Sequence, residues 1–181
     1  MRKLLAGLGM AIFAATPTSA ALPAGAKAPN FTTTGAIAGK PFKLNLAEQL
    51  KHGPVVLYFY PKAFTKGCTL EAHEFAEATP EFAQYGATVV GMSNDDINTL
   101  KRFSKEECRD KFAVAAATPK IVKAYDAALV SEGKRTGLTE RTSYVIDRKG
   151  RIVFVHSDLD YKDHVRLTLE AVRKLQAKRR T

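Results

Sequence analysis

The feature that most constrains the fold of this chain is an unbroken apolar and aromatic run, Val55 to Tyr60, that ends at a proline. Such a run, with β-branched residues at its start, is typical of a short strand that is buried on both faces. Pro61 ends the strand because proline has no N–H to donate to a neighbouring strand. The pattern therefore predicts a central strand around which the rest of the chain is arranged.

A helix pattern follows this strand almost directly and carries one of the two cysteines. Apolar side chains recur among charged ones from Thr69 to Gln84, and Thr65 is suited to cap the first turn. Cys68 is therefore expected in that turn, where unpaired N–H groups and a positive partial charge lie. Thiols at such positions have pKa values between about 3.5 and 7.5, against about 8.5 in free cysteine. We expect Cys68 to be an ionised nucleophile.

The rest of the chain alternates between strand and helix patterns. The elements expected in chain order are a hairpin over 31–44, a short helix over 46–52, a strand over 87–92, a helix over 96–105, a strand over 112–115, a helix over 119–125, a hairpin of strands over 142–147 and 151–156, and a last helix that contains Val165, Leu169, Val172 and Leu175. Pro80 should kink or split the cysteine-bearing helix, residues 130–140 should form a surface loop, and Asp160 should cap the last helix. This order indicates an α/β fold whose sheet has parallel and antiparallel parts.

The segment at the start of the chain has the composition of a secretory signal peptide. Arg2 and Lys3 precede an apolar run from Leu4 to Ala15, and small residues end the segment at Ala20. This run is shorter than the roughly 20 residues that span a bilayer, which favours cleavage after Ala20 over the alternative of a membrane anchor. The sequence predicts a signal peptide over 1–20 and one domain over 21–181, exported without stable membrane insertion. The location is the periplasm if the cell has an outer membrane.

Three short motifs match a known family. Pro61-x-x-x-Thr65-x-x-Cys68 continues as Thr69-x-Glu71-Ala72, residues 28–31 read Ala-Pro-Asn-Phe, and residues 140–147 read Glu-Arg-Thr-Ser-Tyr-Val-Ile-Asp. With these motifs the chain resembles the peroxiredoxins of the AhpC/TSA family, in particular the peroxiredoxin Q or bacterioferritin comigratory protein branch, over about residues 22–176. The resemblance implies a thioredoxin-like fold, with a mixed central sheet flanked by helices.

The resemblance also implies an activity and a set of site residues. A thiol peroxidase would use the Cys68 thiolate to attack hydrogen peroxide or an organic hydroperoxide, which leaves a sulfenic acid. Thr65 would hydrogen-bond the peroxide or the sulfur, Arg141 would hold the thiolate and the peroxide, and Pro61 would shield the site. The plainer alternatives are a helix cap, a strand-edge arginine and a strand terminator. Glu71 matches the branch motif, but an anion there opposes thiolate formation, so its role stays open.

The second cysteine, Cys108, has three interpretations. Many members of the branch carry a resolving cysteine five residues after the nucleophile, where this chain has His73; others carry it in the helix after the second strand. Cys108 is therefore expected to condense with the sulfenic acid to a Cys68–Cys108 disulfide. Its Cα would have to come within about 7 Å of that of Cys68, so the first helical turn would unwind. The alternatives are a static disulfide, natural in an oxidising compartment, and an unpaired thiol.

Residue types and charge argue against other functions. Thr65 stands where a Cys-x-x-Cys would place its first thiol, which disfavours a thioredoxin-like thiol–disulfide oxidoreductase. A non-enzymatic envelope module, such as a copper carrier, is disfavoured because Cys68 has no second soft ligand nearby.

We expect no metal and no bound cofactor, so a partner dithiol has to supply the reducing electrons. The net charge of +10 includes a basic C-terminal cluster, which reads as a solvated helix end, and export argues against nucleic acid as a partner.

Overall fold

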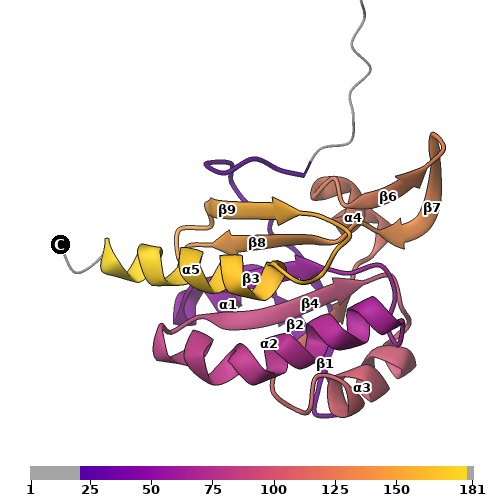
Figure 1. Ribbon diagram of the computed structural model, residues 1–181, viewed down its shortest axis with the longest axis horizontal. Coiled ribbons are helices and arrows are strands. Elements are labelled where there is room, and N and C mark those ends of the chain that lie inside the picture. Colours follow the sequence, from indigo (N-terminus) through magenta and orange to yellow (C-terminus); the bar gives the residue numbers. More distant parts are fainter. Residues whose placement is uncertain (1–20, 179–181) are drawn as a thin grey trace, which may run out of the picture.

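The computed structural model in Figure 1 describes residues 21–178, so the predicted signal peptide over 1–20 lies outside the described residues. The helices are α1 (Leu46–His52), α2 (Lys66–Gln84), α3 (Ile97–Glu106), α4 (Pro119–Ala124) and α5 (His164–Ala177). The strands are β1 (Thr32–Ile37), β2 (Lys40–Asn45), β3 (Val55–Phe59), β4 (Thr88–Ser93), β5 (Ala113–Ala116), β6 (Ala128–Ser131), β7 (Lys134–Thr139), β8 (Thr142–Ile146) and β9 (Ile152–Ser157). None of the described helices is long and apolar enough to cross a membrane.

The predicted central strand is confirmed as the middle of a mixed sheet. Seven strands form one sheet in the order β2-β1-β5-β4-β3-β8-β9, and β6 and β7 form a separate ribbon. β3 pairs in parallel with β4 and antiparallel with β8, and β4 pairs in parallel with β5. Each residue of β3 is buried, as expected for a strand with helices on both faces of its sheet.

Alternate residues of β3 point into two separate cores. Val56 and Tyr58 belong to a core on the face that α2, α3 and α5 cover, where Phe75 of α2 stacks on Tyr58 with ring centroids 4.3 Å apart. Leu57 and Phe59 face the opposite core, which α1 and α4 cover. Figure 1 shows α2 and α5 side by side on the first of these faces, and their residues are in contact. The cysteine-bearing helix α2 therefore packs against both the sheet and its neighbour α5, which contacts the sheet as well.

The structure corrects three details of the prediction. Pro80 does not split α2, because Phe75 and Phe82, on either side of it, are both fully buried and this packing outweighs one lost backbone bond. Residues 130–140 are not a surface loop, since β6 and β7 pair as a hairpin that turns at Glu132 and Gly133, both with positive φ. Asp160 does not cap α5; the N-cap position belongs to Asp163.

A close approach of two backbone turns gives a test of this architecture. Gly53, which ends α1 just before β3, faces the turn after α2, and a Cβ at this position would stand 1.9 Å from the carbonyl oxygen of Gly86. Because a backbone atom cannot swing aside as a side chain does, we expect Gly53→Ala to lower the free energy of unfolding by at least about 2 kcal/mol. Urea unfolding followed by circular dichroism measures this change.

His52→Ala, at the exposed neighbouring position, is the matched control and should stay within about 0.5 kcal/mol of the wild type. An unchanged urea midpoint for Gly53→Ala would show that the two turns are not packed as described.

Candidate active site

The thiol of Cys68 lies in the first turn of α2, as predicted, and the residue is only 2 % exposed. Thr65 occupies the N-cap position with an extended backbone, and its carbonyl accepts a hydrogen bond from the Thr69 N–H at 2.9 Å. Its hydroxyl makes no capping bond within residues 21–178; it donates to the carbonyl of Lys62 at 2.9 Å. The helix start is therefore where the sequence placed it, but the side-chain cap is not formed.

The segment that joins β3 to α2 is fixed to its surroundings by three hydrogen bonds. The Tyr60 N–H donates to the Met92 carbonyl at 3.0 Å, and the Tyr60 carbonyl accepts from the Thr139 hydroxyl at 2.6 Å. Further along, the N–H of Ala63 donates to Oδ2 of Asp95 at 2.8 Å. Pro61 lies half-buried between these contacts. The approach to Cys68 is thus held in one conformation.

Asp95 is a site residue that the sequence reasoning missed. It follows β4, and the hydroxyl of Ser93 donates to the same Oδ2 atom that holds Ala63, at 2.8 Å. A signal was present, because β3 and β4 are parallel and polar residues at the carboxyl ends of neighbouring parallel strands meet at one edge of the sheet.

The structure brings Arg141 to Cys68 through the register of two strands. β3 and β8 pair antiparallel with Phe59 opposite Thr142, so Arg141, one residue before β8, lies beside the end of β3. The guanidinium Nη2 donates to Cys68 Sγ at 3.5 Å, Nη1 donates to Oε2 of Glu71, and Nε donates to the Leu159 carbonyl at 2.9 Å. Because Arg141 is only 5 % exposed, these donors act where water screens little.

Glu71 lies one turn beyond Cys68 on α2 and is fully buried. Burial raises the pKa of its carboxyl to about 8, although the neighbouring Arg141 acts in the opposite direction. Oε2 is paired with Arg141, while Oε1 has no hydrogen-bond partner among the described residues. The carboxyl is therefore close to the point at which it gains or loses a proton near neutral pH.

Two further polar residues behind Glu71 were also missed. Nδ1 of His164, at the start of α5, lies 3.8 Å from Glu71 Oε1 and 2.8 Å from the hydroxyl oxygen of Ser143 on β8. Its Nε2 lies 2.9 Å from the carbonyl oxygen of Asp158. Burial lowers the pKa of His164 to about 4. The sequence carries no signal for this contact, because it depends on how α5 docks.

Cys108 is a free, fully buried thiol in the same core as Cys68. Burial raises the pKa of the Cys108 thiol well above its ordinary value. The residues on either side of it are tied to α2: Glu107 contacts Nε2 of His73 at 2.7 Å, and Arg109 Nη1 contacts Glu77 at 3.2 Å. The structure therefore holds Cys108 beside a later part of α2 and leaves both thiols unbridged.

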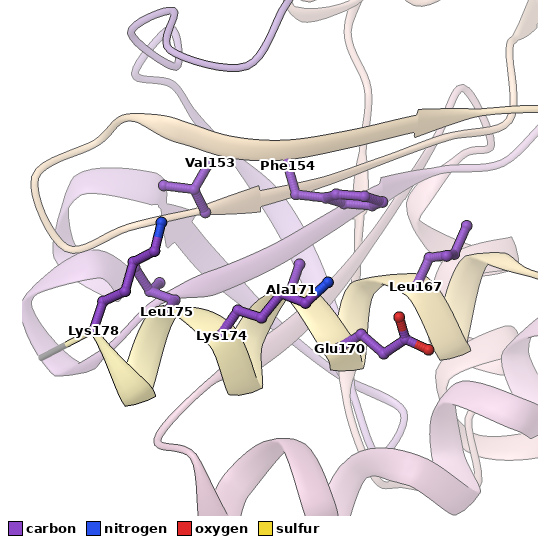
Figure 2. A pocket seen from close by; sticks show the side chains of 8 residues that line it. All are labelled: Val153, Phe154, Leu167, Glu170, Ala171, Lys174, Leu175 and Lys178. Carbon is purple, nitrogen blue, oxygen red and sulfur yellow. The ribbon is translucent and has the colours of Figure 1, made fainter. Parts of the chain in front are cut away.

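A groove between β9 and the C-terminal half of α5 has a volume of about 290 Å³ and is shown in Figure 2. Apolar side chains of both elements line it, among them Phe154 and Leu175, together with Lys174 of α5. Neither Cys68 nor Arg141 lines this groove. Residues 21–178 contain no cluster of His, Cys, Asp or Glu side chains that could hold a metal ion.

Solved structures with the same architecture confirm the thioredoxin-like fold. The peroxidoxin BcpB of Mycobacterium tuberculosis is 29 % identical and superposes with a TM-score of 0.74, over 83 % of this chain and 96 % of that one. The bacterioferritin comigratory protein of Xanthomonas campestris is 25 % identical with a TM-score of 0.70, over 79 % of this chain and 91 % of that one.

Sequence comparison finds relatives that carry the name peroxiredoxin. Peroxiredoxin Bcp of Bacillus subtilis (strain 168) is 30 % identical over 126 residues, which are 68 % of this chain and 80 % of the relative. The chloroplastic peroxiredoxin Q of Triticum aestivum is 31 % identical over 152 residues, which are 83 % of this chain and 67 % of the relative. Residues 24–155 match the AhpC/TSA family. With the cysteine, arginine and glutamate of the shared motifs gathered at one helix start, this chain belongs to the AhpC/TSA family, the peroxiredoxins.

Proposed function

We propose that this protein is a thiol peroxidase that reduces hydrogen peroxide and organic hydroperoxides with Cys68 as its nucleophile. The observation that carries the assignment to Cys68 is the buried guanidinium of Arg141, held 3.5 Å from the sulfur at the start of α2. A permanent charge and the helix N-terminus together favour a thiolate, the reactive form of cysteine. The relatives named peroxiredoxin support the same chemistry.

The reaction proposed for Cys68 is a two-electron oxidation of sulfur. The thiolate attacks one peroxide oxygen, an S–O bond forms as the O–O bond breaks, and the leaving oxygen takes up a proton to become water or an alcohol. Arg141 stabilises the negative charge as it moves from sulfur to the leaving oxygen. Thr65 already donates its hydroxyl hydrogen to Lys62, so its oxygen would accept a hydrogen bond from the peroxide. Pro61 limits the access of water from the β3 side.

We further propose that Cys108 resolves the sulfenic acid. The Cys108 thiol would attack Cys68 Sγ, which expels water and forms the Cys68–Cys108 disulfide. His73, which contacts the segment before Cys108, lies about 7.5 Å further along the α2 axis than Cys68, at 1.5 Å per residue. The two thiols therefore meet only after the Cys108 segment leaves α2 or the first turn of α2 unwinds.

A partner dithiol then has to reduce the disulfide. We propose an exported location for this cycle, supported by the charged start, apolar run and small residues of segment 1–20. The reductant would then be a thioredoxin-like protein or another thiol donor of the same compartment.

The central test removes the nucleophile. We expect Cys68→Ser to lower hydrogen peroxide consumption, with dithiothreitol as reductant, to the rate of buffer alone, because a serine hydroxyl is not ionised at neutral pH. A ferric–xylenol orange assay follows the remaining peroxide, and Cys108→Ser, which should still consume one equivalent in a single turnover, is the control. Unchanged turnover in Cys68→Ser would refute the assignment. Insulin reduction without peroxide consumption would favour the oxidoreductase alternative.

A second prediction concerns the shape of the cation. Arg141→Lys keeps the positive charge, but one ammonium cannot reach Cys68, Glu71 and the Leu159 carbonyl together. We expect the second-order rate constant with hydrogen peroxide, measured by stopped flow, to fall about 100-fold. Arg166→Lys, on the exposed side of α5, should change it less than about twofold. Equal rates for the two variants would show that charge alone is sufficient.

A third prediction concerns Cys108. One equivalent of hydrogen peroxide should convert the reduced wild type to a Cys68–Cys108 disulfide, which mass spectrometry detects as the loss of two hydrogens. The same treatment of Cys108→Ser should leave Cys68 as a sulfenic acid or its over-oxidised products, because no second thiol is present. A trapped sulfenic acid in the wild type as well would rule out the resolving role.

A further inference from the structure

Arg141 assists Cys68 only while its guanidinium is held in place, and His164 contacts one of its two other supports and the residue next to the second. One support is Glu71, whose Oε1 lies 3.8 Å from Nδ1 of His164. The other is the Leu159 carbonyl, which is adjacent in the chain to the Asp158 carbonyl that lies 2.9 Å from Nε2 of His164. The buried imidazole of His164 therefore lies between Glu71 and the segment that carries the Leu159 carbonyl.

The contacts of the ring determine which nitrogen carries hydrogen. A backbone carbonyl can only accept, so Nε2 must donate its hydrogen to Asp158. Burial lowers the pKa of His164 to about 4, so the ring is neutral at neutral pH and Nδ1 keeps its lone pair. This lone pair accepts a hydrogen bond from the Ser143 hydroxyl at 2.8 Å and faces Glu71.

A nitrogen that carries no hydrogen, opposite Glu71, favours the protonated form of that carboxyl. Oε1 has no hydrogen-bond partner within the described part of the chain, and its own lone pairs are repelled by the lone pair of Nδ1. An O–H at the same atom could donate to this lone pair, shared with the Ser143 hydroxyl, after a shift of about 1 Å. A neutral Glu71 also leaves the positive charge of Arg141 to the thiolate, because no second anion competes for it.

We propose that His164 is a positioning residue for the peroxidase reaction, which braces Arg141 through residues 158–159 and keeps Glu71 protonated while Cys68 is a thiolate. The proton that leaves the sulfur is balanced by the one that Glu71 holds, so the summed charge of Cys68, Glu71 and Arg141 is zero in the reactive state. This inference rests on the proposed function. The other titratable groups around the pair are Tyr58 on β3, Glu74 on α2, His156 on β9, and Asp158 and Asp163 in the segment before α5.

Two substitutions separate the contact of Nε2 with the Asp158 carbonyl from the contact of Nδ1 with Glu71. In His164→Gln the amide reaches the place of Nε2, so the donor to Asp158 is kept and the acceptor facing Glu71 is lost. In His164→Asn the amide lies near the place of Nδ1, so the acceptor is kept and the donor is lost. His156→Gln is the control, since the ring of His156 lies against that of His164, with centroids 4.6 Å apart and planes tilted by 59°, and takes part in neither contact.

The readout is the pH dependence of iodoacetamide alkylation at Cys68, quantified by mass spectrometry without peroxide. We expect His164→Gln to move the midpoint of this profile up by about 1 pH unit, a tenfold loss of thiolate below it, because an ionised Glu71 then draws on Arg141. His164→Asn should keep the wild-type midpoint but react about tenfold more slowly with hydrogen peroxide, since residues 158–159 are no longer braced. His156→Gln should match the wild type in both measurements.

Two additional variants keep the inference falsifiable if His164→Gln does not fold. Ser143→Ala leaves the Nδ1 lone pair entirely to Glu71, so the midpoint should move down. In a Glu71→Gln background, where residue 71 is always neutral, His164→Asn and Ser143→Ala should both leave the midpoint in place. Equal midpoints for the wild type and Ser143→Ala, or a Ser143→Ala shift that persists with Glu71→Gln, would overturn the inference. Failure of the proposed function is distinct from these outcomes, because it would appear as wild-type protein that does not consume peroxide.

Discussion

The site depends on one buried cation, the guanidinium of Arg141, whose donors are shared among three acceptors from two parts of the chain. Removing the Arg141 guanidinium from water is costly, and that cost is recovered only if its donors are all paired with good geometry. The acceptors are the sulfur of Cys68, the carboxyl of Glu71 and the carbonyl of Leu159. The first two are on α2 and the third is in the loop before α5, so the position of the arginine fixes how the two helices meet above the sheet.

The same cation imposes a competition between two acids. A thiolate at Cys68 and a carboxylate at Glu71 are both stabilised by Arg141, but two anions against one cation leave a net negative charge in a site of low polarity. Burial favours the neutral form of Glu71 and raises its pKa to about 8. An acidic residue in the family motif is therefore compatible with a reactive thiolate, which resolves the objection that the sequence alone raises against Glu71.

The parts of the site that could be predicted are those that depend on local sequence or on motifs. The strand, the proline and the helix start place Cys68 without tertiary information, and the strand register then brings Arg141 to it. The contact of His164 with Glu71 depends on the packing of α5 against α2, which no local pattern encodes. The β6–β7 hairpin was missed for a similar reason. Its polar residues resemble a loop, and the pairing depends on the Glu132–Gly133 turn, where φ is 50° and 74°.

The segment around Cys108 is held mainly by packing. The ion pair between Arg109 and Glu77 joins two exposed side chains, and such pairs contribute about 0–1 kcal/mol. Cys108 itself is fully buried, and Phe112, which follows it, is 3 % exposed. Between them Arg109 and Asp110 adopt left-handed backbone conformations, with φ of 51° and 60°, which disfavour this turn by about 1 kcal/mol per residue. A segment anchored by a few buried side chains and a strained turn opens at lower cost than the whole domain, so a resolving thiol here would be released by local unfolding while the sheet and Arg141 stay in place.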